Sequence, residues 1–239
     1  LDLKNPKGRD VALQLIQSAD IVLENFRTGT MANLGLDYDS LKATHPSLIY
    51  CSLKGFLSGP YENRVALDEV TQMMGGLAYM TGLPERPLRA GSSVIDITGG
   101  MFGVIAILSA LHRRRETGEG SHVTSALFET TAFLVGQHMA QQAVSGEPPP
   151  PMSVRQSAWA VYDIFELDSG ERLFVGIVSD TLWQRFCEEF SLTDWASDQT
   201  LASNADRVAA RETLLPAIKG PLPHDASRRG VPASAASSS

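Results

Sequence analysis

The feature of this sequence that most constrains its fold is an alternation of helical and strand-like segments near its start. Residues 6–19 place apolar side chains at helical spacing behind a proline, and residues 39–44 form a second helical segment that ends before Pro46. Residues 21–23 and 48–53 are short apolar runs of strand length. This order predicts βαβ units, and therefore an α/β fold with a Rossmann-like parallel sheet.

The remainder of the chain predicts more helices and then a change of domain. Four successive prolines within 146–152 are typical of a linker. Alternating segments on either side of Asp168-Ser169-Gly170 predict a β-hairpin. The further helices are expected at 67–79, 96–115, 125–144, 181–190 and 205–218.

These patterns predict a domain organisation. We expect part of a large Rossmann-like domain at 1–145, a linker at 146–156, the start of a smaller α+β domain at 157–219, and a disordered tail at 220–239. The chain opens on Leu-Asp-Leu-Lys without an initiator methionine. We therefore expect it to be a fragment of a longer protein.

Composition and charge limit the class of protein. The 239 residues are 43% hydrophobic and 20% charged, which is typical of a globular chain, and the net charge of −7 argues against a general role on nucleic acid or at a membrane surface. The apolar run at 101–111 is too short to cross a bilayer, and Cys51 and Cys187 form no CxxC pair. We expect a cytoplasmic protein with reduced thiols and with neither nucleic acid nor membrane as a partner.

Asp96 stands where a loop gives way to a long apolar helix, just before Gly99-Gly100. As a helix N-cap it would accept hydrogen bonds from free amides and stabilise the helix by about 1 kcal/mol. As a nucleophile, kept ionised by the helix dipole, it could attack an acyl thioester and form a mixed anhydride. The residues alone favour the cap, and the two roles are compatible.

A second candidate site follows the first predicted strand, at Glu24-Asn25-Phe26-Arg27. An amide, an aromatic ring and a cation suit a nucleotide, and Lys4 or Lys54 could add a phosphate contact. The alternative is an ordinary loop with a half-buried phenylalanine and two solvated lysines. Each of these features, taken alone, favours that alternative.

Other chemistry finds little support. The five histidines show no metal-ligand spacing, so we expect no metal site. Ser92-Ser93 lacks the GxSxG elbow of a hydrolase, and the glycines of TGEG fit neither a Walker loop nor a dinucleotide fingerprint.

Read in order, these segments resemble the family III CoA-transferases, which include formyl-CoA transferase, carnitine CoA-transferase and α-methylacyl-CoA racemase. The resemblance covers nearly the whole chain from Leu1 to about Lys219. The matching stretches include LDLKNPKGRDVALQLIQSADIVLENFRTG, LGLDYDSLKATHPSLIYCSLKGF, GGLAYMTG, RRRETGEGSHVTSALFE and AVYDIFELDSGERLFVGIVSDTLWQRFCEEF.

The resemblance implies roles for particular residues. Asp96 falls at the family's catalytic aspartate, which carries first an acyl anhydride and then a CoA thioester. The implied CoA contacts are Leu1, Asp2, Leu3 and Lys4 for the adenosine phosphate, Asn25, Phe26 and Arg27 at a strand end, and Val65, Ala66, Leu67 and Asp68 in a further loop. Asn33 replaces an arginine common in the family. Leu67 replaces the acid/base histidine of the racemase branch, which disfavours racemase chemistry because leucine cannot shuttle a proton.

The resemblance also implies partners. Family members are longer than this chain and form interlinked homodimers; acyl-CoA and a small carboxylic acid are the substrates, and no cofactor is bound permanently. ALDEVTQMMGGLAYMTG and SAWAVYDIF are similar to members that act on C4–C5 dicarboxylates, including mesaconyl-CoA C1–C4 CoA transferase. Arg64, Arg86 and Arg89 are candidates to bind a second carboxylate.

Three functions stay open at this point. The first is transfer of CoA between two acids, and the second is transfer of CoA within one molecule, which needs the same residues. The third is a truncated remnant with no activity.

Overall fold

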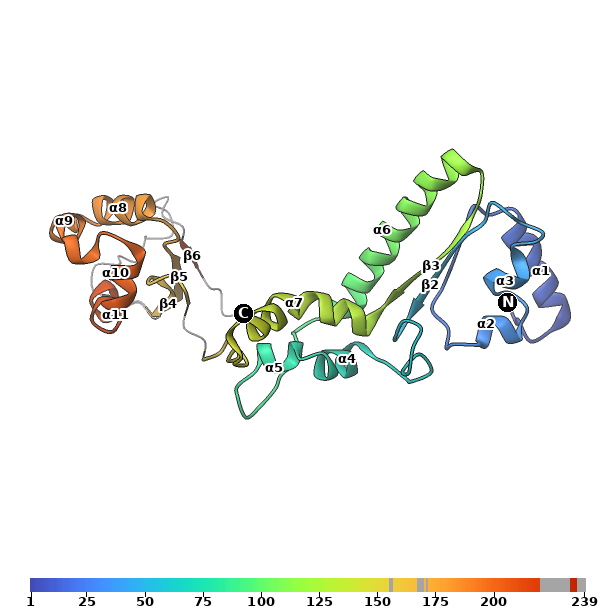
Figure 1. Ribbon diagram of the computed structural model, residues 1–239, viewed down its shortest axis with the longest axis horizontal. Helices are drawn as coiled ribbons and strands as arrows, with labels where there is room; N and C mark the ends of the chain where they lie inside the picture. Colours follow the sequence, from blue (N-terminus) through green and yellow to red (C-terminus); the bar gives the residue numbers. More distant parts are fainter. Residues whose placement is uncertain (155–156, 167–169, 171, 220–232, 236–239) are drawn as a thin grey trace. The chain divides into compact units, whose positions relative to one another are not determined.

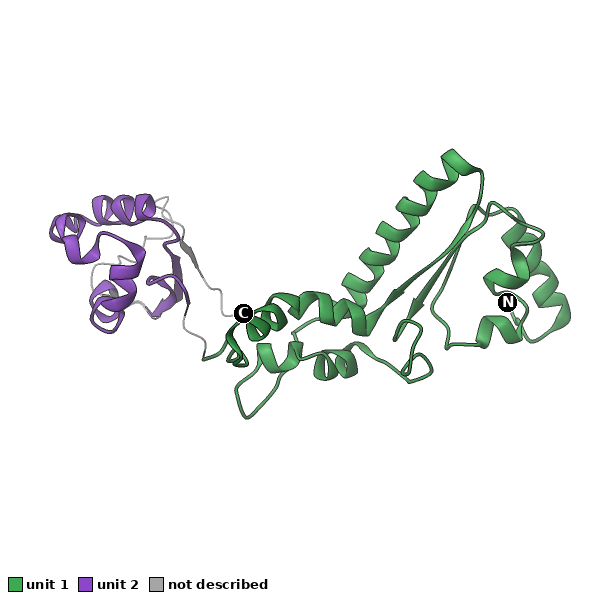
Figure 2. Cartoon of the chain, viewed as in Figure 1, with its two compact units in different colours: residues 1–155 green, residues 156–239 purple. Residues whose placement is uncertain are grey.

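The computed structural model describes residues 1–154, 157–166, 170, 172–219 and 233–235 (Figure 1). The chain divides into two compact units, Leu1–Arg155 and Gln156–Ser239 (Figure 2). Both units combine helices with a small sheet, so the α/β class is confirmed. Their assignment to part of a large Rossmann-like domain and to the start of a smaller α+β domain stays a prediction.

The first unit is built on a three-stranded parallel sheet whose strands follow one another in chain order. The register pairs Glu24 with Ser52 and Lys54 with Ala126, so the carboxyl ends of the strands lie at one edge. Ligands collect at that edge in open parallel sheets. The strands are β1 (Ile21–Glu24), β2 (Ile49–Lys54) and β3 (Ser121–Ala126).

The first two strands confirm the predicted apolar runs, whereas the third corrects the sequence interpretation. The sequence predicts a turn and then a helix from Ser125, but β3 occupies these residues and α7 (Leu127–Ser145) begins directly after it. The side chains of β3 alternate between half-buried and exposed until Ser125 and Ala126, which are buried. A short strand with this many polar residues lacks the apolar run that marks β1 and β2.

Helices pack on the sheet through two different contacts. α1 (Pro6–Gln17) begins at the N-cap Asn5 with proline in its first turn, as predicted, and joins β2 in one apolar cluster. The cluster consists of Leu13, Ile16, Val22, Tyr38, Leu41, Leu48 and Tyr50, with Tyr38 and Leu41 from α3 (Tyr38–Leu41). α2 (Thr30–Asn33) lies between β1 and α3 in the sequence.

α6 (Val94–Thr117) contacts β2 and β3 through its small residues. Gly103 is buried, and a Cβ atom there would lie 2.8 Å from the end of the Leu53 side chain, so a larger residue would have to displace that side chain. The hydroxyl of Ser125 donates a hydrogen bond to the Gly99 carbonyl at 2.8 Å. The start of α6 is thereby fixed above the carboxyl end of the sheet.

α6 is also the one helix among the described residues that is long and apolar enough to cross a membrane, on length and composition alone. Core helices of soluble proteins have the same composition. Several of its apolar side chains are exposed, namely Ile97, Met101, Val104, Ile105 and Leu108.

The sequence predicts one helix over 67–79, but the structure has two. α4 (Asp68–Met74) ends at Gly75, and α5 (Leu77–Thr81) follows Gly76. Gly76 has a φ of 87°, a left-handed conformation that interrupts a helix and that glycine adopts without strain. The Gly75-Gly76 pair is therefore a turn.

The second unit confirms the predicted hairpin and adds helices. β4 (Tyr162–Glu166) pairs antiparallel with β5 (Arg172–Gly176), and Asp168 and Ser169 of the predicted turn lie outside the described residues. The predicted helix at 205–218 is divided at Ala210. The helical segments are α8 (Asp180–Glu189), α9 (Thr193–Ser197), η1 (Gln199–Leu201), α10 (Asn204–Ala209) and α11 (Arg211–Lys219).

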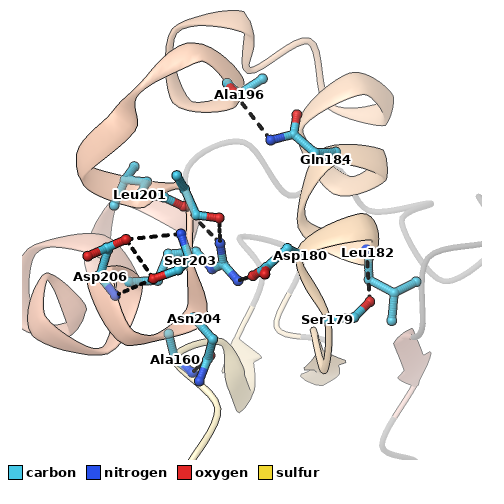
Figure 3. Close-up of polar contacts among 12 residues, drawn as sticks. Ala160, Ser179, Asp180, Leu182, Gln184, Ala196, Leu201, Ser203, Asn204 and Asp206 are labelled. Carbon is cyan, nitrogen blue, oxygen red and sulfur yellow. Dashed lines mark hydrogen bonds and ion pairs between the residues drawn. The ribbon is translucent and has the colours of Figure 1, made fainter.

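Polar contacts fix the start of α10 in this unit. Ser203 and Asp206 form a capping box, and the Asn204 side chain accepts a hydrogen bond from the Ala160 amide at 3.1 Å (Figure 3). Arg207 is buried over the Trp183 ring and pairs with Asp180. Charged and aromatic groups thus share one core in the second unit.

The predicted linker and the predicted disordered tail both contain residues with regular contacts to the rest of the chain. Within the predicted linker, the Met152 amide donates a hydrogen bond to the Met80 carbonyl at 2.9 Å, so this part of the segment is attached to the first unit. Within the predicted tail, residues 233–235 form a short strand, β6 (Ala233–Ala235), paired with β5. Residues 220–232 and 236–239 lie outside the described residues.

Candidate active site

Asp96 lies in the first turn of α6 and not at its N-cap. The helix begins at Val94 and its N-cap is Ser93, whose side chain makes no capping hydrogen bond. Asp96 itself is exposed, and within the described part of the chain its carboxylate accepts no hydrogen bond. The N-cap interpretation of Asp96 is therefore wrong, and the carboxylate is accessible to a ligand.

The capping role belongs to Asp68, the first residue of α4. Its carboxylate is buried and accepts hydrogen bonds from the amides of Ile95 at 2.8 Å and of Asp96 at 3.1 Å. The Gln72 side chain donates to the other carboxylate oxygen and accepts a hydrogen bond from the Ala90 amide. Asp68 thus satisfies two free amides of α6 and fixes the backbone that carries Asp96.

The surroundings of Asp96 raise the pKa of its carboxyl group. Although Asp96 is exposed, the neighbouring protein partly shields its carboxyl group from water; this is the larger cause, because it disfavours the charged form, and the negative charge of Asp68 is the second. A carboxyl group whose pKa is shifted in a pocket is a candidate functional residue.

Replacing Asp68 tests this electrostatic coupling. In Asp68→Asn the negative charge is lost, and the pKa of Asp96 is expected to fall toward its ordinary value. Carbon-13 NMR of the labelled aspartate side chains measures that titration. Glu69→Gln removes a neighbouring charge that is exposed and does not contact Asp96, so it serves as the control. An Asp96 pKa that is the same in wild type and Asp68→Asn would contradict the coupling.

A pocket of about 460 Å³ contains Asp96. Its walls combine the strand ends at Asn25 and Lys54 with Gly99 and Gly100 of α6. A Cβ atom on Gly100 would meet nothing within 4 Å, so the space beside the carboxylate is open. The volume is within the range of small-molecule sites.

A second pocket of about 350 Å³ shares a wall with the first, including Asn25 and Lys54. Phe26, Arg27 and Arg64 line it in addition, and the ring of Phe26 is half exposed. Among the described residues, neither arginine is paired with a carboxylate, although the Arg64 guanidinium lies 4.3 Å from the centre of the Tyr61 ring. The two pockets thus place the Asp96 carboxylate next to a pocket that two arginines line.

The structure brings most of the sequence-predicted site residues together at these pockets. The predicted residues that line one or both are Asn25, Phe26, Arg27, Val65, Ala66, Leu67, Asp68 and Asp96. Leu1, Asp2, Leu3 and Lys4 precede α1 and line neither pocket; Leu1 is 75% exposed. Their predicted contact with an adenosine phosphate stays a prediction.

The three candidate arginines differ in position. Arg64 lines the second pocket, whereas Arg86 and Arg89 line neither of the two. Arg89 forms an ion pair with Glu69. Arg64 is therefore the arginine of the three that can reach a ligand in these pockets.

Sequence reasoning missed the pairing of Glu24 with Lys54. The Lys54 ammonium lies 2.6 Å from a carboxylate oxygen of Glu24, and the Glu24 side chain is 3% exposed. The available signal was that each residue directly follows a predicted strand. Its use required the register of the two strands, which a single sequence does not give.

Within the described residues, no group of three or more histidine, cysteine, aspartate or glutamate side chains could hold a metal ion. The arrangement instead offers an accessible carboxylate for covalent chemistry and cations for an anionic ligand.

Comparison with known proteins gives a consistent result. Residues 1–226 match the model of the family described as CoA-transferase family III. Succinate–glutarate CoA-transferase of Agrobacterium fabrum is 34% identical over 87% of this chain and 52% of its own length. Acetyl-CoA:oxalate CoA-transferase of Acetobacter aceti is 31% identical over 93% of this chain and 58% of its own length. Succinyl-CoA:mesaconate CoA-transferase of Haloarcula hispanica is 31% identical over 90% of this chain and 55% of its own length.

Solved structures agree with this similarity. A CaiB/BaiF family protein from Brucella suis has a TM-score of 0.81 and 33% identity, over 99% of this chain and 65% of that one. Rv3272 from Mycobacterium tuberculosis has a TM-score of 0.82 and 25% identity over the same shares. The chain spans about half the length of the curated relatives it matches.

Proposed function

The chain belongs to CoA-transferase family III, and from this premise we propose that it is an enzyme in which Asp96 carries coenzyme A between an acyl-CoA and a carboxylic acid. The observation that carries the proposal is the accessible Asp96 carboxylate, held at the start of α6 inside a pocket and beside the strand ends. The pocket and an accessible carboxylate thus occur together, which supports the proposal.

The proposed reaction proceeds through two kinds of intermediate on Asp96. The carboxylate attacks the thioester carbonyl of the acyl-CoA, which forms a mixed anhydride and releases CoA thiolate. The thiolate then attacks the aspartyl carbonyl, so the first acid leaves as a carboxylate and Asp96 becomes a CoA thioester. The acceptor carboxylate attacks this thioester, which releases CoA thiolate again and forms a second mixed anhydride. The thiolate then attacks the acyl carbonyl of the acceptor, so the new acyl-CoA forms and Asp96 leaves as a free carboxylate. Water must be excluded, because it would hydrolyse the anhydride.

The proposed substrates are small dicarboxylates. The three curated relatives above are named for succinate, glutarate, oxalate or mesaconate. Support from the chain itself is Arg64, a cation with no carboxylate partner among the described residues, in the pocket that adjoins Asp96. A dicarboxylate has a second charge that a guanidinium can bind in a bidentate manner.

Incubation of the purified protein with succinyl-CoA and one acceptor acid at a time tests the proposal. We expect a new CoA thioester of glutarate, mesaconate or oxalate, in equal amount to the succinate released, as measured by liquid chromatography and mass spectrometry. Acetate as acceptor is the matched control, because it lacks the second carboxylate. Hydrolysis of succinyl-CoA with no new thioester would contradict the proposal.

The same assay distinguishes the two alternatives. Rearrangement of mesaconyl-CoA without any added acid would favour transfer within one molecule, which uses the same residues. Absence of both transfer and CoA binding would favour a non-catalytic remnant.

Several further properties belong to this proposal. The implied homodimer, the cytoplasmic location and the absence of a permanently bound cofactor stay predictions. Coenzyme A enters the reaction as the thioester substrate.

A further inference from the structure

Glu24 and Lys54 form a nearly closed set of contacts around one residue of the proposed CoA site, Phe26. A Glu24 carboxylate oxygen accepts a hydrogen bond from the Phe26 amide at 2.8 Å. The Lys54 ammonium donates to the Phe26 carbonyl at 2.9 Å. The other Glu24 oxygen lies 2.6 Å from the same ammonium, so the ion pair closes the ring.

Both charges are largely withdrawn from solvent. The side chain of Glu24 is 3% exposed and that of Lys54 is 18% exposed. Buried charges of this kind cost desolvation free energy and are compensated only by close pairing and additional hydrogen bonds. Here the additional hydrogen bonds are made with the backbone of Phe26, so the pair and the loop conformation depend on each other.

The consequence concerns the neighbours of Phe26. Glu24 and Lys54 hold the amide and the carbonyl of Phe26 by hydrogen bonds, so Asn25 is confined between the end of β1 and Phe26. Asn25 lines both pockets. Arg27 follows directly and lines the second pocket. The position of the amide and of the cation therefore depends on Glu24 and Lys54.

Lys54 also lines both pockets, which raises the alternative that its ammonium binds a phosphate. Two features argue against that role. Its charge is neutralised by Glu24, and two of its three donors are already used. Arg27 and Arg64 instead supply cations without carboxylate partners, within the described part of the chain.

We propose that the Glu24–Lys54 pair is a positioning device that holds the loop Asn25–Arg27 in the conformation that binds coenzyme A. This inference rests on the proposed function, since it assumes that the loop contacts CoA. It assigns the pair no contact with the reacting atoms.

The sign of one substitution separates positioning from direct binding. Coenzyme A is an anion, so if Lys54 bound its phosphates, removing the opposing charge in Glu24→Gln would strengthen CoA binding. If the pair positions the loop, Glu24→Gln is expected to weaken CoA binding roughly tenfold, because the ion pair with Lys54 is lost and the Phe26 amide keeps only a weaker, neutral acceptor. Isothermal titration of the protein with coenzyme A measures this. Binding that is unchanged or tighter in Glu24→Gln would overturn the inference.

A double variant distinguishes a loss of CoA binding from a loss of folding. Breaking a buried pair leaves one charge uncompensated, whereas Glu24→Gln with Lys54→Met removes both charges. The double variant is expected to unfold at a denaturant concentration closer to that of wild type than either single variant, yet to bind CoA as weakly as they do. Wild-type CoA affinity in a folded double variant would contradict the inference.

Two further measurements complete the design. Hydrogen exchange at the Phe26 amide is expected to be faster in Glu24→Gln, a readout that does not involve CoA. Asp39→Asn with Lys42→Met removes an exposed ion pair of equal length, 2.6 Å, and should change neither measurement. If wild type binds no CoA, the proposed function fails; if wild type binds CoA and Glu24→Gln binds it equally well, only the positioning inference fails.

Discussion

Asp96→Ala is expected to reduce CoA transfer by at least about a thousandfold, because the proposed covalent intermediates form on this carboxylate. CoA binding should remain close to that of wild type, since the proposed contacts lie in the loops at Asn25–Arg27 and Val65–Leu67. The measurement is transfer from succinyl-CoA to a dicarboxylate, together with the Kd for coenzyme A.

The same variant should keep its fold, and the pKa of Asp96 explains why. A carboxyl whose pKa is raised in the folded state binds its proton more tightly there than in the unfolded chain. Its favourable contribution is present below the unfolded pKa and is lost as pH rises through the folded pKa. At neutral pH the carboxylate gives no stabilisation through this linkage, so its removal should not lower stability.

Asp10→Asn, an exposed substitution on α1, is the matched control for this experiment. It should leave both transfer and CoA binding unchanged. Substantial transfer by Asp96→Ala would show that another group is the nucleophile. Loss of CoA binding in Asp96→Ala would show instead that Asp96 contributes to the binding site itself.

Gly120→Ala is expected to destabilise the first unit by about 3 kcal/mol, because there is no room for a methyl group beside β2. A Cβ atom on Gly120 would lie 2.0 Å from the Leu48 carbonyl oxygen and 2.7 Å from the Leu48 nitrogen. These are backbone atoms, which cannot rotate away as a side chain can. The amides of Gly120 and Ser121 also donate to Pro46 and Leu48 at the start of β3.

Chemical unfolding of Gly120→Ala measures this effect, and α7 offers a matched control. A Cβ atom on Gly136 would meet nothing within 4 Å. Gly136→Ala is therefore expected to raise stability by up to about 1 kcal/mol, because alanine favours the helix more than glycine does. Unfolding of Gly120→Ala at the wild-type denaturant concentration would contradict the packing of β3 against β2.

The fold was predictable where hydrophobic patterns were strong. Apolar runs indicated β1 and β2, and the proline in the first turn of α1 indicated where that helix begins. β3 could not be recognised in the same way, because its side chains are mostly polar and its identity as a strand depends on pairing with β2, far away in the sequence. The turn at Gly75-Gly76 needed the backbone conformation of Gly76, which glycine permits but does not require.

The site was predictable only in part, for a related reason. The residues alone favoured Asp96 as an N-cap, and the family resemblance was needed to interpret it as a nucleophile. Asp68 caps α6 from a different helix, a contact between residues 28 positions apart that no local pattern encodes. The Glu24–Lys54 pair likewise depends on the register of two strands.

The central claim is that Asp96 becomes covalently activated during each cycle. Hydroxylamine attacks an aspartyl anhydride or thioester and leaves a stable hydroxamate, so it can trap this state during turnover with succinyl-CoA. Mass spectrometry of the digested protein should then find a hydroxamate on Asp96, in an amount that depends on the acyl-CoA. A protein that transfers CoA but is modified at another residue, or at none, would contradict the account.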